Sequence, residues 1–219
     1  MQHLDVAGGT GDVALRVLRE IRQAEIKSKD SKASTPVGTV TVSDINADML
    51  EAGKRDMVSK WNRLSRKLPV PLCTQQHSPL GEDDIKWVVA DAENLPFDDS
   101  TFDSYTIAFG IRNVTNVSAA LDEAYRVLKP GGVFICLEFS HINNPLLARM
   151  YDYYSFNIIP AIGKFAVRDS DSYRYLVESI RKFPDQETFK DMIEDSGMRL
   201  CSYDNIMDGV IALHYGVKV

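Results

Sequence analysis

The chain has 219 residues, of which 44% are hydrophobic and 26% are charged, and its formal net charge is −6. These values predict one soluble domain with a single core and argue against a nucleic-acid partner, because such partners require clustered Lys and Arg. The sequence contains no run of about 18 apolar residues, so it does not predict a membrane span. Cysteines and histidines are scattered along the chain, which argues against a disulfide framework and against a bound metal.

Short apolar runs alternate with helical patterns in the first two thirds of the chain. This alternation is typical of a mainly parallel sheet that is covered by helices on both faces, which is an α/β fold. The expected strands span residues 4–7, 39–43, 86–90, 102–109 and 133–138. The expected helices span residues 13–21, 48–60 and 120–128, and Pro130-Gly131-Gly132 ends the last of them.

Two polar stretches interrupt this alternation. Residues 27–34 predict an exposed loop, and residues 68–84, which are rich in Pro, Gly and charge, predict a mobile insertion. The basic run over residues 54–67 contains apolar residues at intervals, so we interpret it as the solvated face of a helix.

The last third of the chain has a different composition. Residues 145–165 are rich in Tyr, Phe, Ile and Met and predict a helical insertion, which we place at about residues 143–182. Apolar residues at helical spacing predict two helices, one containing Tyr173, Leu176, Val177 and Ile180, the other containing Phe189, Met192 and Ile193 and ending at Gly197. Residues 200–205 and 211–217 predict an antiparallel hairpin that completes the sheet.

A loop of small residues follows the first expected strand. Ala7, Gly9 and Gly11 allow a sharp turn into a helix and a close approach to a ligand, and the start of that helix offers free N–H groups. Residues 9–14 also satisfy the dinucleotide pattern GxGxxA. A tight turn without a ligand remains the alternative.

Carboxylates follow the second and third expected strands. Asp44 stands where a carboxylate can accept hydrogen bonds from ribose hydroxyls, or it caps the helix that follows Asn46. Asp91, with the N–H of Ala92, stands where an adenine edge can be recognised, or it is a turn residue. Because the carboxyl ends of parallel strands meet at one edge of the sheet, these residues predict a nucleoside pocket.

Four segments in this order resemble the S-adenosylmethionine-dependent methyltransferases of the seven-stranded, class I Rossmann-like type: LDVAGGTGD, SDIN, DAENLPFDDSTFD and RVLKPGG. The resemblance implies that Asp5 lies near the methionine amino end of the cofactor and that Asp44 holds its ribose. It also implies that Ile45 packs on the adenine, while Asp91 and Ala92 recognise the adenine edge. The loop residues that it implies in cofactor binding are Gly9, Thr10 and Gly11.

Further segments are similar to the ubiquinone/menaquinone biosynthesis C-methyltransferases: AFGIRNVTN, RVLKPGGVFICLEFS, NNPL and YDYYSFNIIP. This resemblance implies methyl transfer to a ring carbon of a 2-methoxy-6-polyprenyl-1,4-benzoquinol. The long loops favour a mitochondrial member on the matrix side of the inner membrane. Such a member is expected to make a peripheral membrane contact and to associate with other ubiquinone-biosynthesis proteins, and a homodimer is a further possibility.

The implied reaction needs a group that favours the quinol oxyanion beside the methyl. Arg112 and Asn113, just after the fourth strand, are the leading candidates. Arg112 would stabilise the quinolate or polarise a water molecule, and the alternative is a salt bridge that orients the loop. Glu138 and His141, after the fifth strand, are further candidates.

The aromatic insertion suits the polyprenyl tail of the implied substrate. Tyr151, Tyr154 and Phe156, with Ile158 and Ile159, are candidates to line a channel for the tail, and ordinary core packing is the alternative.

Two other functions fit parts of this sequence. A nicotinamide oxidoreductase would share GxGxxA and Asp44, but it requires a second nucleotide-binding half after residue 110. A non-catalytic subunit of a quinone-synthesis assembly would keep the fold without turnover. Members of the family carry an upstream helical region with a Tyr-Asp-x-Met-Asn segment and a His-x-x-Trp pair, which this sequence lacks, so we expect weak cofactor retention and slow or absent turnover.

Overall fold

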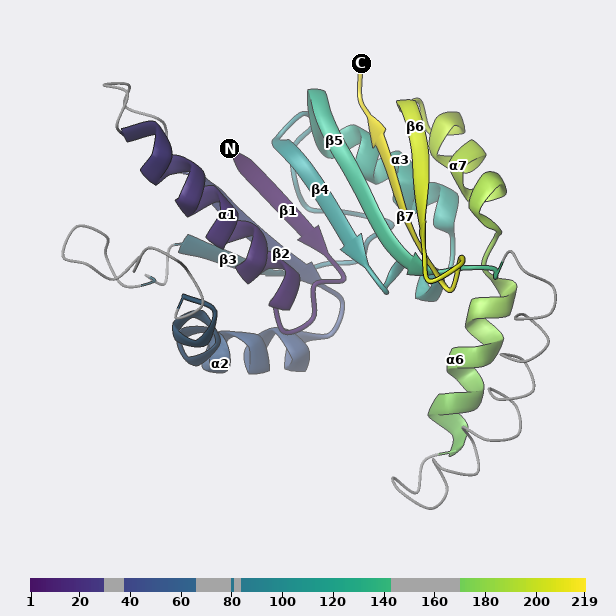
Figure 1. The fold of residues 1–219 in the computed structure, drawn as a ribbon, viewed down its shortest axis with the longest axis horizontal. Coiled ribbons are helices and arrows are strands. Elements are labelled where there is room, and N and C mark those ends of the chain that lie inside the picture. Colours follow the sequence, from purple (N-terminus) through teal and green to yellow (C-terminus); the bar gives the residue numbers. More distant parts are fainter. Residues whose placement is uncertain (30–37, 66–79, 81–83, 143–169) are drawn as a thin grey trace.

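The computed structural model describes residues 1–29, 38–65, 80, 84–142 and 170–219, and its strands form one seven-stranded sheet (Figure 1). The strands lie in the order β3-β2-β1-β4-β5-β7-β6. Their bounds are β1 Gln2–Val6, β2 Thr39–Asp44, β3 Ile85–Val89, β4 Phe102–Ala108, β5 Leu128–Phe139, β6 Arg199–Ile206 and β7 Ile211–Val217. The helices are α1 Asp12–Lys29, α2 Ala47–Ser65, the short 3-10 helix η2 Ile111–Asn113, α3 Val117–Val127, α6 Ser170–Lys182 and α7 Gln186–Asp195.

Strands β1 to β5 are parallel to one another, whereas β7 is antiparallel to both β5 and β6. The prediction of a mainly parallel sheet with a C-terminal antiparallel hairpin is therefore confirmed. Insertion of β7 between β5 and β6 also departs from the continuous parallel sheet of dinucleotide-binding folds. The second nucleotide-binding half that a nicotinamide oxidoreductase requires does not occur in the described residues after residue 110.

Several predicted boundaries were wrong. Helix α1 continues to Lys29, so residues 27–29 of the predicted loop 27–34 are helical, and its remaining residues lie outside the described residues. Helix α2 continues past Lys60 to Ser65. The insertion predicted over residues 68–84 and the aromatic segment 145–165 also lie almost entirely outside the described residues, whereas α6 and α7 are the two helices predicted after residue 170.

Strand β5 begins five residues before the predicted start at residue 133, so Leu128 belongs to the strand and not to the preceding helix. The reason is a contact with the far end of the chain. The N–H of Gly131 donates to the carbonyl of Lys218 at 2.6 Å, and the N–H of Lys218 donates to the carbonyl of Gly132 at 3.0 Å. These long-range bonds bring the Pro-Gly-Gly segment into the sheet, where local turn propensity predicted a break.

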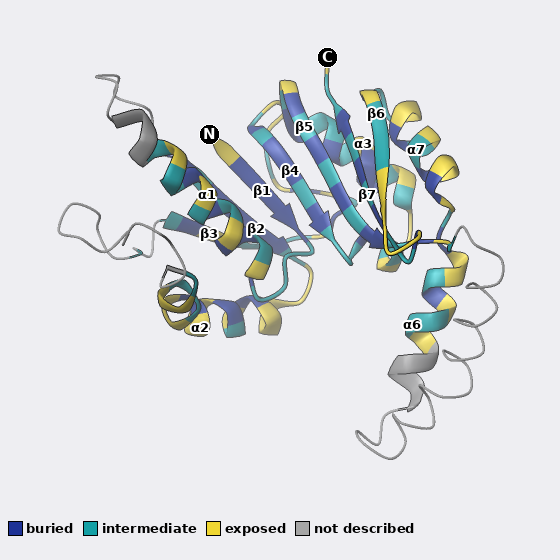
Figure 2. Cartoon of the chain, in the orientation of Figure 1, coloured by how far each residue is buried: buried dark blue, intermediate teal, exposed yellow. Residues whose placement is uncertain are grey.

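Each face of the sheet has its own apolar cluster (Figure 2). Helices α1 and α2 cover one face, where Leu15 and Leu18 pack with Val42 of β2. Helices α3 and α7 cover the other face, where Leu121 and Phe189 pack with buried residues of β1, β4 and β5. Burial on both faces explains why the strands are rich in apolar residues, and the few buried polar side chains within them, such as His3, Asp5 and Ser104, need partners inside the fold.

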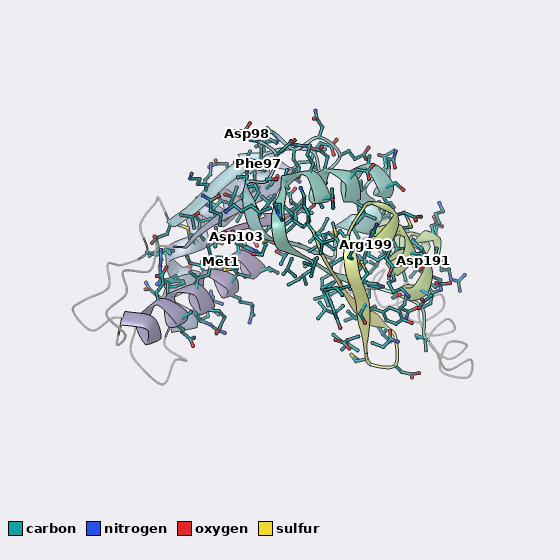
Figure 3. The ribbon with its side chains drawn as sticks, turned by 90° about the horizontal axis from the view of Figure 1, so that it is seen from above. Met1, Phe97, Asp98, Asp103, Asp191 and Arg199 are labelled. Carbon is teal, nitrogen blue, oxygen red and sulfur yellow. The ribbon has the colours of Figure 1, made fainter. Side chains whose placement is uncertain are left out.

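The amino and carboxyl ends of the parallel strands lie at opposite edges of the sheet and have different neighbours. At the amino edge, Met1 and Asp103 lie next to each other (Figure 3), and the N–H of Gln2 donates to Oδ2 of Asp103 at 2.6 Å. At the carboxyl edge lie the loops after β1 to β4, with α6 below them in Figure 1. Among the described residues, no helix combines the length and apolarity of a membrane span.

Candidate active site

A cavity of about 330 Å³ lies at the carboxyl edge of β1 to β4. The segments that follow these four strands line it, as the strand-end rule for open parallel sheets predicts. The lining contains these residues singled out from the sequence: Ala7, Gly9, Asp44, Ile45, Asp91, Ala92 and Asn113. The sequence analysis missed the others, which are Val6, Met49, Ala90, Glu93, Phe109, Gly110, Val114 and Thr115.

The glycine loop (residues 7–11) joins β1 to α1. Gly9 and Gly11 have φ angles of +52° and +74°, which glycine adopts without steric cost. A Cβ on Gly11 would lie 2.6 Å from the ring of Trp87, so the loop also packs closely on β3. Thr10 and Gly11 lie outside the lining of the cavity, and they shape the loop from its far side.

Asp44 connects the end of β2 to the glycine loop. Its Oδ2 accepts from the N–H of Gly9 at 2.9 Å, and its Oδ1 accepts from the N–H of Asn46 at 2.8 Å. The bond to Asn46 corresponds to the capping role considered above. Each carboxylate oxygen can accept two hydrogen bonds, so Asp44 retains acceptors for two hydroxyl groups in the cavity.

The segment after β3 forms the next wall of the cavity. Asp91 is exposed, and its Oδ1 accepts from the N–H of Glu93 at 3.0 Å, so the turn role is present. Ala92 is only 9% exposed, whereas Ile45 on the neighbouring loop is 69% exposed. The exposed Ile45 offers an apolar surface to the cavity, and Asp44 and Asp91 offer carboxylate oxygens. This combination suits a ligand that has both an apolar ring and polar edges.

Glu93 joins this segment to the loop after β4. Its Oε1 accepts from the N–H groups of Thr115 and Asn116 at 2.9 and 3.0 Å. Asn116 in turn caps α3, because its side chain accepts from the N–H of Ala119. The only sequence signal for Glu93 is its place two residues after Asp91, which does not reveal a partner 22 residues away.

Arg112 and Glu138 form a buried ion pair behind the cavity. Nη1 of Arg112 donates to Oε1 of Glu138 and to the carbonyl of Phe109, both at 2.7 Å. The two charged side chains are 10% and 1% exposed. Burial raises the pKa of Glu138, and the charge of Arg112 opposes this shift. Arg112 is therefore engaged in the salt bridge that the sequence analysis weighed against a catalytic role.

Asn113, the other leading candidate, does line the cavity. Its Oδ1 accepts from the hydroxyl of Tyr175 on α6 at 3.2 Å. His141 lies elsewhere, with Nε2 at 2.9 Å from the carbonyl of Phe183. The tail-channel candidates Tyr151, Tyr154, Phe156, Ile158 and Ile159 lie outside the described residues.

Asp5 lies beneath the glycine loop and not on the wall of the cavity. Its Oδ1 accepts from the hydroxyl of Thr106 at 2.6 Å, and Thr106 Oγ1 lies 3.1 Å from Nε2 of His3. Nδ1 of His3 lies 2.7 Å from the hydroxyl of Ser104, which extends the polar row. Burial raises the pKa of Asp5 to about 7 and lowers the pKa of His3 to about 4.

The charges that line the cavity have one sign. Asp44, Asp91 and Glu93 are in the lining, and no Lys or Arg is among the described lining residues. Such a wall attracts a cationic ligand and repels phosphate groups. The acidic lining is therefore a fit for a sulfonium cofactor and a poor fit for a dinucleotide.

Comparisons with known proteins identify the family to which this chain is similar. A family model described as the ubiE/COQ5 methyltransferase family matches residues 1–218. The chain is 47% identical over 238 residues to the mitochondrial 2-methoxy-6-polyprenyl-1,4-benzoquinol methylase of Rattus norvegicus and 45% identical to that of Homo sapiens. Both alignments cover all of this chain and 67% of the relative, so the chain spans about two thirds of their length.

Solved structures agree on the fold. The CurJ carbon methyltransferase has a TM-score of 0.61 at 12% identity, covering 100% of this chain and 48% of that one. A possible histamine N-methyltransferase from Thermotoga maritima, described as S-adenosylmethionine-dependent, has a TM-score of 0.59 at 15% identity. That alignment covers 100% of this chain and 82% of the Thermotoga chain. At these identities the similarity identifies the class I methyltransferase fold alone.

Proposed function

The chain belongs to the ubiE/COQ5 methyltransferase family, and we propose that it transfers a methyl group from S-adenosylmethionine to a ring carbon of 2-methoxy-6-polyprenyl-1,4-benzoquinol in ubiquinone biosynthesis. Identity of 47% along the whole chain to a methylase of that name supports this substrate. The observation that carries the proposal is the acidic cavity at the carboxyl edge of the sheet, with Asp44, Asp91 and Glu93 on its wall.

The glycine loop and the segments after β2 and β3 would hold the cofactor. Asp44 would accept from the ribose hydroxyls, and Ile45 would pack on the adenine. Asp91 and the N–H of Ala92 would contact the adenine edge. S-adenosylmethionine supplies an electrophilic methyl group on a positively charged sulfur, and three carboxylates in the wall favour that charge.

The chain mainly has to align the acceptor carbon with the methyl group and exclude water. Asn113 and Thr115 are the polar side chains after β4 in the described lining, and we assign Asn113, which is next to Arg112, a hydrogen bond to the quinol oxygen beside the reacting carbon. The positive charge of Arg112 is compensated by Glu138, and a guanidinium is a poor base, so we assign Arg112 to holding the turn that presents Asn113. The proton that the quinol loses in exchange for the methyl group would pass to the solvent when the site opens to release the product.

The rest of the substrate and the cellular setting extend the same proposal. Tyr151, Tyr154 and Phe156 would line the path of the polyprenyl tail. The curated relatives carry mitochondrial names, which supports a place in mitochondria. We propose the matrix side of the inner membrane, with a peripheral membrane contact and other ubiquinone-biosynthesis proteins as partners.

Titration calorimetry of the purified chain tests the cofactor. S-adenosylmethionine should bind and NADH should not, and Asp44→Ala should weaken the binding because it removes the ribose acceptors and the bond to Gly9. Binding of NADH without S-adenosylmethionine would contradict the proposal.

A turnover assay tests the reaction. With labelled cofactor and the demethyl quinol carrying a short prenyl tail, the product should gain one labelled methyl group on the ring. Cofactor binding without turnover, both in this chain and in a version extended at its N-terminus, would favour the non-catalytic subunit instead.

A further inference from the structure

Lys60 of α2 contacts the glycine loop from outside the cavity. Its Nζ donates to Oγ1 of Thr10 at 2.9 Å, to the carbonyl of Thr10 at 3.2 Å and to Oδ2 of Asp12 at 2.8 Å. The side chain of Lys60 is 17% exposed, and that of Asp12 is 65% exposed. The ammonium group thus donates all three of its N–H groups, two to Thr10 in the glycine loop and one to Asp12 at the start of α1.

This contact corrects the interpretation of the basic run over residues 54–67 as a uniformly solvated face. Lys54, on the same helix, is 44% exposed and pairs with Glu51 within α2. Lys60 instead makes contacts 50 and 48 residues away in the sequence. The two lysines differ because α2 packs beside α1 in a way that brings Lys60, and not Lys54, to the glycine loop.

The loop that Lys60 contacts contains glycines, which allow many backbone conformations in the absence of other contacts. Thr10 stands between Gly9 and Gly11, both at positive φ, and glycine carries the largest conformational entropy of any residue. On the cavity side, Oδ2 of Asp44 accepts from the N–H of Gly9 at 2.9 Å. On the opposite side, Lys60 holds the carbonyl and the hydroxyl of Thr10, whose hydroxyl also donates to Asp12 at 2.7 Å.

We propose that Lys60 is a positioning residue for cofactor binding: it holds Thr10 so that the glycine loop already has its binding shape before the cofactor arrives. This inference rests on the proposed function, because it takes the acidic cavity as the cofactor site. Ordering a loop in advance lowers the entropy that binding must remove. Loss of the contact therefore weakens binding and leaves the transfer step of the bound complex unchanged.

The test compares Lys60→Met with Lys54→Met, which removes the same charge from the same helix without touching the loop. Lys60→Met should raise the Kd and the KM for S-adenosylmethionine about tenfold and leave kcat within about twofold. Lys54→Met should change neither quantity. Lys60→Arg should recover part of the affinity, because a guanidinium can still donate to Thr10 and Asp12.

Hydrogen exchange in the absence of ligand gives a second readout. Amides of residues 8–11 should exchange faster in Lys60→Met than in wild type, whereas amides of β4 should not change. Equal exchange in the glycine loop, or an unchanged Kd in Lys60→Met, would overturn the role of Lys60. Failure of the wild-type chain to bind S-adenosylmethionine, both alone and in a version extended at its N-terminus, refutes the proposed function itself, so the two failures are distinguishable.

Discussion

The glycine loop and the Arg112 turn (residues 109–113) are neighbours at the cavity but are held in place differently. The glycine loop is held by groups at its periphery, among them Lys60 and the 65% exposed side chain of Asp12. The Arg112 turn is held by a charge pair whose acidic member, Glu138, is 1% exposed. Water can compete for the exposed carboxylate of Asp12 and cannot reach that of Glu138.

This difference suits the two tasks proposed for the loops. A loop that is ordered in advance by several contacts, each worth little, loses its shape gradually as they are removed one at a time. A turn that presents Asn113 to a reacting ring must stay in one place, and a buried pair that is costly to break provides this. We therefore expect large, abrupt effects from changes behind the Arg112 turn and small, graded effects from changes around the glycine loop.

The largest effect is expected from Glu138→Ala. It leaves the guanidinium of Arg112 buried without its partner, which should reduce the free energy of unfolding by about 3–5 kcal/mol. Urea denaturation measures the loss. Glu51→Ala, which breaks a solvent-exposed pair with Lys54, is the control and should leave the midpoint unchanged. If the two variants unfold at the same urea concentration, the Arg112 turn is not held as described.

The next effect concerns the polar row beneath the glycine loop. The pKa of Asp5 is raised in the folded state to about 7, so the folded chain binds a proton that the unfolded chain has lost, and stability falls as pH rises from about 4 to 7. The pKa of His3 is lowered to about 4, so the unfolded chain binds the extra proton, and stability rises between pH 4 and about 6.5.

These opposite slopes should nearly cancel in the wild type. From pH 5 to 8, Asp5 removes about 2–3 kcal/mol of stability and His3 adds about 2 kcal/mol. In Asp5→Asn only the His3 contribution remains, so the free energy of unfolding of this variant should be about 2 kcal/mol higher at pH 8 than at pH 5. Urea denaturation at each pH measures it. His3→Gln should lose stability over the same range. Parallel pH profiles for the two variants would refute this account of the polar row.

A smaller effect is expected from a substitution where the Arg112 turn touches the glycine loop. A Cβ on Gly110 would lie 2.4 Å from the Cβ of Ala7, so Gly110→Ala should cost about 1–3 kcal/mol by overpacking. The φ of Gly110 is −120°, which any residue adopts, so the cost is purely steric. Ala7 has a φ of +51°, where glycine is favoured, and Ala7→Gly should rescue Gly110→Ala. A double-mutant cycle with no coupling between these sites would show that the loops are independent.

The smallest effect is expected from Asp12→Asn, which removes the exposed partner of Lys60. Because surface ion pairs contribute little, the Kd for S-adenosylmethionine should rise only about two- to threefold. The difference from wild type should shrink further in high salt, which screens the pair. A larger change than in Lys60→Met would mean that Asp12, and not Lys60, holds the loop.

Much of the fold and part of the cavity follow from local sequence patterns. The periodicity of hydrophobic residues predicts the order of strands and helices. Carboxylates after successive strands, Asp44 and Asp91, predict that the cavity lies at the carboxyl edge of the sheet. These features are predictable because they depend on residues close together in the chain. The predicted helix ends at residues 21 and 60 were wrong, because α1 and α2 continue to Lys29 and Ser65. The predicted start of β5 at residue 133 was wrong because its first residues bond to the far end of the chain.

The sequence by itself determined that Asp44 and Asp91 stand at the carboxyl edge, where they make the cavity wall acidic. Only the tertiary structure decided which charges meet: Arg112 with Glu138, and Lys60 with the glycine loop. It also decided that Asp5, although next to the loop in sequence, lies beneath it. A side chain's partner depends on how distant elements pack, because charge interactions act through space and no periodicity along the chain encodes them.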